Sequence, residues 1–149
     1  MLILFQISKG APLIRQKNKT IYAVHLMLRR EHRIFIMRRH NTSYYDNHYA
    51  LPVWEIGGEE TPVAALVRKA SEKLGIDIDL TGVRLAHARN GPDGMANFFF
   101  EAVRWSGCVD NREPEKYNYL AWCPPAHMPL NFVPHVKKAI EHAEENRMQ

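Results

Sequence analysis

The chain has 149 residues, of which 46% are hydrophobic and 24% charged, as expected for one globular domain with a single core. Its net charge of +4 and pI of about 9.2 favour anionic ligands, but no basic run is dense enough to indicate nucleic-acid binding. No apolar stretch approaches the roughly 18 residues needed to span a membrane, and the N-terminal segment lacks the basic start of a signal peptide. We therefore expect a cytoplasmic protein with no membrane contact.

Residues 1–19 are predicted to form an N-terminal extension, and residues 20–149 the folded domain. The segments TIYAVHLML and RIFIMRR are rich in residues that favour strands, and the polar RREH between them predicts a hairpin. After the loop HNTSYYDNH, the segment YALPVW is expected to form one short strand. Gly57 and Gly58 then predict a turn.

A helix is predicted to begin after Thr61, a good N-cap, with Pro62 as its first residue. Gly75 stands where a C-terminal glycine cap is expected. Between them, apolar residues recur at helical spacing and predict an inward-facing stripe of Val63, Leu66, Val67, Ala70 and Leu74.

The rest of the chain alternates strand signals with turns. VRLAHA and NFFFEAV are predicted strands joined by the turn RNGPDG, and YLAWC is a last short strand. Asn131 is expected to cap a final helix that runs to about His142 and turns inward Phe132, Val136, Ala139, Ile140 and Ala143. This order predicts an α+β fold, an α/β/α sandwich around a mixed β-sheet.

The segment from Trp54 to Ile76 has the most specific spacing in the chain. Glu60 is followed after seven residues by Arg68, and then by Glu72 and Gly75. In this spacing the segment resembles the signature of the Nudix superfamily of MutT-like hydrolases. That signature runs glycine, five residues, Glu, seven residues, Arg-Glu, an aliphatic, any residue, Glu-Glu, any residue, glycine and an aliphatic. The similarity, which includes the flanking strands, covers roughly residues 20–143.

Three positions of the segment depart from the signature. Trp54 replaces the first glycine, Lys69 replaces the Glu after Arg68, and Lys73 replaces the second Glu of the pair. In the family, carboxylates on this helix face bind magnesium or manganese ions that bridge the substrate's diphosphate and help to activate water. A lysine about 4 Å from a divalent ion would repel it by roughly 8 kcal/mol at an effective dielectric of 20. The resemblance therefore indicates a degenerate Nudix box with hydrolysis lost or strongly impaired.

The retained positions suggest that the frame of the box survives. By resemblance, Glu60 and Arg68 tie the loop to the helix, and Gly75 ends the helix. Lys69 and Lys73 place two positive charges where metal ions would otherwise lie. The leading hypothesis is that they hold a nucleoside-diphosphate-linked or other phosphate-bearing small molecule directly, without a cofactor.

Two aromatic residues are further ligand-binding candidates. Trp54 either stacks on a ligand ring or fills part of the metal pocket, and Tyr49 either adds aromatic surface to the cleft or packs in the core.

Two alternatives stay open. In the first, the chain is a divergent hydrolase, or an enzyme repurposed for other chemistry, with a rebuilt site for Mg²⁺ or Mn²⁺. The metal would be held by Glu55, Glu59 and Glu72, and the catalytic residues would be Glu72 and Glu115, because Nudix enzymes often place a further Glu on a late loop. In the second, Trp54 closes the cleft and the chain is a non-catalytic interaction module. The resemblance also allows a homodimer, because dimers are common in the family.

Overall fold

The computed structural model describes residues 21–91 and 94–147. The expected N-terminal extension and the Pro-Asp pair of the RNGPDG turn lie outside these residues. Within the described ranges, neither α-helix is long and apolar enough to cross a membrane. In chain order, the described elements are β1 (Ile21–Arg30), β2 (Arg33–Arg39), β3 (Tyr49–Ala50), β4 (Val53–Gly57), α1 (Pro62–Leu74), β5 (Asp77–Ile78), the 3₁₀ turn η2 (Leu80–Gly82), β6 (Val83–Asn90), β7 (Ala96–Ala102), β8 (Trp105–Ser106), β9 (Tyr117–Cys123), the 3₁₀ turn η3 (Pro125–His127) and α2 (Pro134–Arg147).

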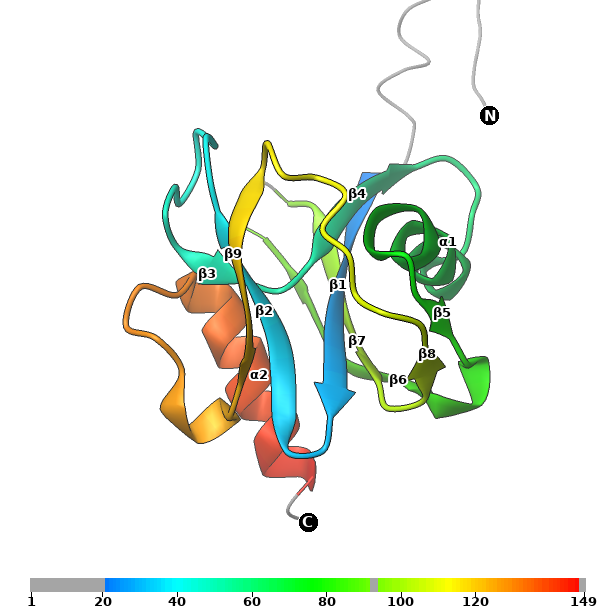
Figure 1. Cartoon of the computed structure of the whole chain (residues 1–149). Helices are drawn as coiled ribbons and strands as arrows, with labels where there is room; N and C mark the ends of the chain where they lie inside the picture. Colours follow the sequence, from blue (N-terminus) through cyan, green and yellow to red (C-terminus); the bar gives the residue numbers. More distant parts are fainter. Residues whose placement is uncertain (1–20, 92–93, 148–149) are drawn as a thin grey trace, which may run out of the picture.

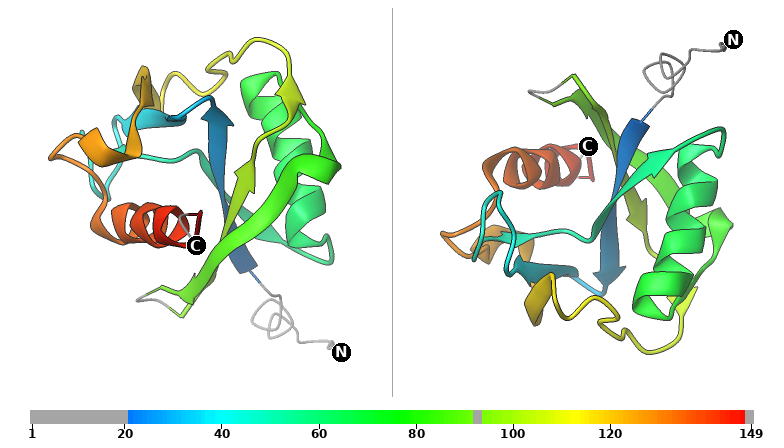
Figure 2. Two further views of the ribbon diagram at one scale, coloured as in Figure 1. Left: turned by 90° about the horizontal axis from the view of Figure 1, so that it is seen from below. Right: turned by 90° about the horizontal axis from the view of Figure 1, so that it is seen from above.

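The described elements form three layers, with a sheet between α1 and α2 (Figure 1 and Figure 2). Seven of the described strands make up the sheet: β3, β2, β1, β7 and β6 are successive neighbours, β4 pairs with β1, and β9 pairs with β2. β1 and β7 run parallel, and the other strand pairs of this sheet are antiparallel. The predicted α+β fold, an α/β/α sandwich around a mixed sheet, is confirmed.

Strand β1 is buried on both faces because it lies at the centre of the sheet. Val24, Leu26 and Leu28 belong to the core on the α1 side, whereas Met27 belongs to the core on the α2 side. This alternation follows from the two-residue period of a strand. It places the side chain of His25 on the α2 side of the sheet, where its ring stacks on Phe99 with centroids 4.0 Å apart.

β1 also changes partner along its length. Its end forms the predicted hairpin with β2, in which Arg30 pairs with Arg33. Its first half pairs instead with β4, from Ile21 opposite Gly57 to His25 opposite Val53. β2 and β4 therefore flank different parts of β1, and they diverge where the candidate site described below opens.

Helix α1 has the boundaries and the buried face that the sequence predicts. The hydroxyl of Thr61 accepts a hydrogen bond from the backbone N–H of Ala64 at 3.3 Å. Gly75 ends the helix with a φ of +70°, a left-handed conformation that glycine adopts at little cost. The predicted apolar stripe faces the core, with three members buried and two partly buried: Leu66, Ala70, Leu74, Val63 and Val67.

Two predicted elements differ from the structure. YALPVW is not one strand: β3 pairs with β2 and β4 pairs with β1, and Pro52 between them has no N–H to continue a ladder. The last helix starts at Pro134 instead of Asn131 and continues to Arg147 instead of about His142. The Asn131 side chain donates a hydrogen bond to the carbonyl of Asn47, 2.8 Å away, and so ties two loops together instead of capping the helix.

A cluster of charged side chains around the buried Glu101 and Arg29, the Glu101 cluster, connects the C-terminal end of α2 to the sheet. Glu101 on β7 forms ion pairs with Arg29, Arg84 and Arg147, and Arg29 also pairs with Glu144. Although burial raises the pKa of Glu101, hydrogen bonds from Arg84 and Arg29 hold it below its ordinary value. The cluster thus joins β1, β6 and β7 to the last turns of α2.

Candidate functional site

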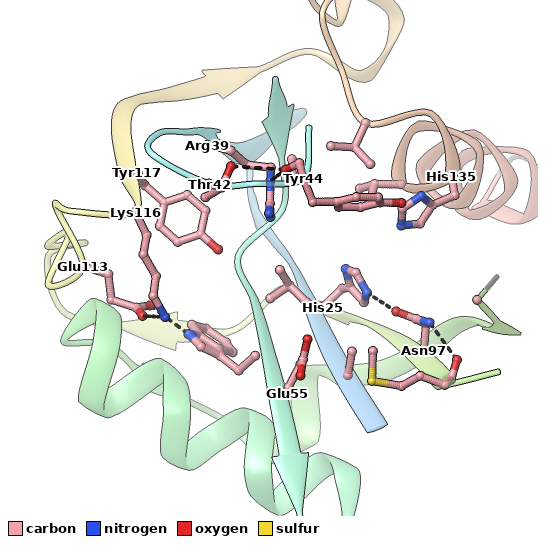
Figure 3. Close-up of a pocket in the computed structure, with 18 of the residues that line it drawn as sticks. His25, Arg39, Thr42, Tyr44, Glu55, Asn97, Glu113, Lys116, Tyr117 and His135 are labelled. Atoms are coloured by element: carbon pink, nitrogen blue, oxygen red, sulfur yellow. Dashed lines mark hydrogen bonds and ion pairs between the residues drawn. The ribbon is translucent and has the colours of Figure 1, made fainter. Parts of the chain in front are cut away.

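The candidate site is a pocket of about 840 Å³ that is lined by residues of both helices and of the sheet between them. Its walls come from β1, the loop after β2, β4, α1, the start of β7, the loop before β9 and the start of α2. Figure 3 shows labelled side chains from β1, the loop after β2, β4, β7, the loop before β9 and the start of α2 facing the same space. Segments that are far apart in the sequence therefore share one cavity.

Lys69 and Lys73 both line this pocket from successive turns of α1. Residues four apart lie on the same helix face, so the two ammonium groups lie on the same wall. Among the described residues, neither lysine forms an ion pair with a carboxylate, in contrast to Lys116. The pocket thus holds two cationic groups that are available to an anion.

Glu72 is not among the residues that line the pocket, and its carboxylate pairs with Arg68. Its Oε1 lies 3.3 Å from the Arg68 guanidinium, and its side chain is 49% exposed. Arg68 also donates hydrogen bonds to both carboxylate oxygens of Glu60, the shortest at 2.8 and 3.0 Å. These bonds, together with the charges of Arg68 and Lys69, hold the pKa of Glu60 below its ordinary value. Arg68 therefore joins the loop before α1 to the helix through Glu60, and it also pairs with Glu72.

Trp54 is buried and contributes both to the core on the α1 side and to the pocket wall. Its indole N–H donates to Glu113 Oε1 at 3.1 Å, and the other carboxylate oxygen of Glu113 lies 3.4 Å from the Lys116 ammonium. The pocket remains open beside this indole. Trp54 and Lys116 thus hold the carboxylate of Glu113, on the loop before β9, at the pocket wall.

The other acidic residues suggested by the sequence do not converge. Glu55 lines the pocket, whereas Glu59 and Glu115 are exposed and lie outside its lining. Of the two late-loop glutamates, it is Glu113 and not Glu115 that reaches the pocket. Across residues 21–91 and 94–147, no three His, Cys, Asp or Glu side chains are grouped so as to hold a metal ion.

Tyr49 lies outside the pocket lining as well. Its side chain packs against the core on the α2 side, and its backbone exchanges hydrogen bonds with Asn131 and Val133. Tyr44, in the preceding loop, lines the pocket instead, and its carbonyl accepts a hydrogen bond from Arg39 at 2.8 Å.

Several lining residues were not among the predicted site residues: His25, Arg39, Asn97, Lys116, Tyr117 and His135. Burial lowers the pKa of His25 to about 4 and raises that of Tyr117 to about 12, so both side chains are neutral near pH 7. No spacing rule could have grouped these residues, because they come from separate segments that meet only in the folded sheet.

The chain belongs to the NUDIX family, because the family model of the NUDIX domain matches residues 19–143. Three solved structures illustrate the similarity of fold. The MutT NUDIX hydrolase from Burkholderia pseudomallei has 20% identity and a TM-score of 0.72, with 81% of this chain and 95% of that chain covered. The MutT protein from Methanosarcina mazei Go1 has 14% identity and a TM-score of 0.71, with 87% and 96% covered.

The third is the NUDIX domain of Shewanella oneidensis NrtR, solved in complex with ADP ribose. It has 18% identity and a TM-score of 0.65, with 87% of this chain and 89% of that chain covered. At these identities the similarity establishes the fold. No curated protein matches the chain in sequence.

Proposed function

We propose that this Nudix protein binds a nucleoside-diphosphate-linked or other phosphate-bearing small molecule, and that its box is degenerate, with magnesium-dependent hydrolysis lost or strongly impaired. The observation that carries this proposal is that Lys69 and Lys73 line the pocket from one face of α1 without a carboxylate partner among the described residues. Lysine ammonium groups bind phosphates as point charges. They take the place of a metal ion in holding a diphosphate.

The position of Glu72 supports the loss of hydrolysis. It is the one carboxylate retained at the three signature positions on the helix, and it pairs with Arg68 and is not part of the pocket lining. A divalent ion in this pocket would face two ammonium groups on the α1 wall. Both the missing ligands and the added positive charge disfavour such an ion.

The size and lining of the pocket support a nucleotide-like ligand. A volume of about 840 Å³ lies within the range of pockets for small molecules and cofactors. Trp54, Tyr44 and Tyr117 supply aromatic surface, and Arg39 adds a further positive charge. The ADP ribose complex of the NrtR domain supports the same class of ligand.

Trp54 lines a pocket and does not fill it, which argues against the hypothesis that Trp54 closes the cleft of a non-catalytic interaction module. A rebuilt metal site that includes Glu55, Glu59, Glu72 and Glu115 remains the competing enzyme hypothesis, with Mg²⁺ or Mn²⁺ as its cofactor. The homodimer and the cytoplasmic location stay predictions, and the mass of the protein in solution tests the first of them.

Thermal unfolding with ADP and ADP ribose, in EDTA or in magnesium, tests the proposal. A ligand at about 100 times its dissociation constant adds about 2.7 kcal/mol to the free energy of unfolding, and we expect this in EDTA. The variant K69A/K73A should lose the effect. The matched control K137A/K138A, which removes two lysines of α2 outside the pocket lining, should retain it.

Two outcomes would contradict the proposal. Stabilisation only with magnesium or manganese, accompanied by turnover of the ligand, would favour the rebuilt metal site. No stabilisation by any nucleotide or nucleoside diphosphate sugar would favour an interaction module.

A further inference from the structure

His25 lies at the centre of the sheet, between β4 and β7, and contributes to the pocket wall. It is 3% exposed, and its ring stacks on Phe99 with an angle of 17° between the ring planes. Figure 3 shows the ring joined on one side to Asn97, while Tyr44 and His135 project into the same pocket. Packing therefore fixes the orientation of the imidazole.

Two hydrogen bonds determine which ring nitrogen carries the proton. The Asn97 side chain lies 3.0 Å from the carbonyl of Met95, and a carbonyl can only accept, so the amide NH₂ faces Met95. The amide oxygen of Asn97 therefore faces His25, where it lies 2.8 Å from Nε2. Because this oxygen also only accepts, Nε2 of His25 must carry the hydrogen.

The second nitrogen, Nδ1, is consequently an acceptor. The ring is neutral near pH 7, since burial lowers its pKa to about 4, and a neutral imidazole carries one proton only. Nδ1 is buried and has no hydrogen-bond partner among the described residues. An unsatisfied buried acceptor is uncommon in folded proteins, and it calls for a partner that the described residues do not supply.

Two side chains that line the same pocket as His25, those of His135 and Tyr44, are not fully buried. Nδ1 is covered in the ligand-free chain, so a ligand must displace a neighbour to reach it. His135 lies close enough to His25 for its charge to contribute to the lowered pKa, and it is only partly buried. Tyr44, on the loop after β2, is 51% exposed. Both side chains line the pocket.

We propose that His25 determines ligand specificity in this pocket, because its Nδ1 accepts a hydrogen bond from an N–H or O–H group on the uncharged part of the ligand. The inference rests on the proposed function, in which Lys69 and Lys73 hold the phosphates. It adds that the ligand is a phosphate ester whose remaining moiety presents a donor, and that an analogue without this donor is rejected. A buried acceptor left unpaired gives this kind of discrimination.

The donor can belong to a nucleobase amine or to a sugar hydroxyl, and a panel of probes separates the two. ADP is compared with purine riboside diphosphate, which lacks the amino group, and with dideoxy-ADP, which lacks the ribose hydroxyls. All titrations are made in EDTA. We expect ADP to bind roughly tenfold more tightly than one of these analogues, as the loss of one such hydrogen bond implies.

The direct readout is the ¹⁵N signal of His25 in protein labelled at histidine. In the free protein we expect Nε2 protonated and Nδ1 unprotonated. ADP should shift the Nδ1 signal in the direction of a newly accepted hydrogen bond, and the analogue without the donor should not. His87, which also packs near Phe99 but lies outside the pocket lining, serves as the internal control.

Two substitutions complement the spectra. H25F keeps a planar ring on Phe99 and should abolish the preference for ADP over the analogue, whereas H87F should keep it. N97D retains an acceptor for Nε2 and favours a charged imidazole, which turns Nδ1 into a donor and should reverse the preference. If neither variant folds, the spectra of the parent protein decide.

The outcomes separate this inference from the proposed function. If ADP binds and K69A/K73A abolishes binding, but Nδ1 does not respond and no analogue is disfavoured, the inference is wrong and the proposed function stands. A protonated Nδ1 in the free protein also overturns it. If no phosphate compound binds, both are wrong.

Discussion

The indole N–H of Trp54 donates a hydrogen bond across 3.1 Å to the carboxylate of Glu113, 59 residues further along the chain. Trp54 stands where the Nudix signature has a glycine, and Glu113 lies on the loop that precedes β9. The larger side chain thus connects β4 to the late loop.

A double-mutant cycle measures this connection. W54F keeps an aromatic ring in the core but removes the N–H, and E113L removes the acceptor together with its charge. Hydrogen bonds to charged groups contribute about 1.5 to 3 kcal/mol, so the two variants should be coupled by a free energy of this order. Urea unfolding of the parent, both single variants and the double variant gives the value. Additive effects would show that the contact contributes nothing to stability.

Restoring the two carboxylates on α1 should restore a metal site. K69E/K73E recreates the acidic face of the signature and replaces two repelling charges with two ligands. We expect Mn²⁺ to bind at least tenfold more tightly than to the parent, as measured by calorimetry or by electron paramagnetic resonance.

The control for this experiment is K137E/K138E on α2, which changes the net charge by the same amount. If that variant gains Mn²⁺ affinity equally, the effect is one of overall charge and not of the helix face that lines the pocket.

Position 75 favours glycine for two reasons: its backbone is in the left-handed conformation, and the side chain of Arg112 lies close to it. Its φ is +70°, and an added Cβ would lie 2.7 Å from Nη2 of Arg112. G75A should cost about 1 to 2 kcal/mol for the left-handed conformation, and it should also displace Arg112 from the carbonyl of Ser71. G94A, with a φ of +82° and open space around the added Cβ, isolates the conformational cost. Equal losses in the two variants would mean that the Arg112 contact is unimportant.

His25 should make stability depend on pH. Its pKa is about 4 in the folded protein, against an ordinary value of 6.5 in the unfolded chain. As pH falls below 6.5 the unfolded state binds a proton that the folded state does not, so stability decreases until about pH 4. Between about pH 7 and about pH 5 the loss from this residue is on the order of 2 kcal/mol.

Urea unfolding of the parent and of H25F at these two pH values tests this prediction. The pKa values of His87 and His135 are also lowered by burial and act in the same direction, but they remain in both proteins. The difference between the two pH dependences therefore belongs to His25. Parallel dependences would show that the buried ring is not responsible.

The elements that the sequence predicted well are those with local signals. Helix α1 follows from the cap at Thr61, the glycine at position 75 and the apolar period between them. The hairpin of β1 and β2 follows from two strand-rich segments around a short polar turn. The predicted start of α2 was wrong because Asn131 is a good cap by type, but its side chain has a non-local partner, Asn47.

The site was predictable only where the signature reached it. The spacing of the Nudix signature identified Trp54, Lys69 and Lys73, and all three line the pocket. His25 and Asn97 were not identified, because they meet across the parallel pairing of β1 with β7, 72 residues apart in the chain. Such a pairing depends on the whole sheet, so no local pattern specifies it.

The Glu101 cluster and the pocket lie at opposite ends of α2. Arg147 and Glu144 hold the last turns of the helix, while His135 and Val136 in its first turn line the pocket roughly 15 Å away. A packed helix tends to open as one cooperative unit in hydrogen exchange. Opening of α2 would therefore break the ion pairs and expose the pocket in a single event, and a ligand bound beside His135 would slow amide exchange in the turn that contains Arg147.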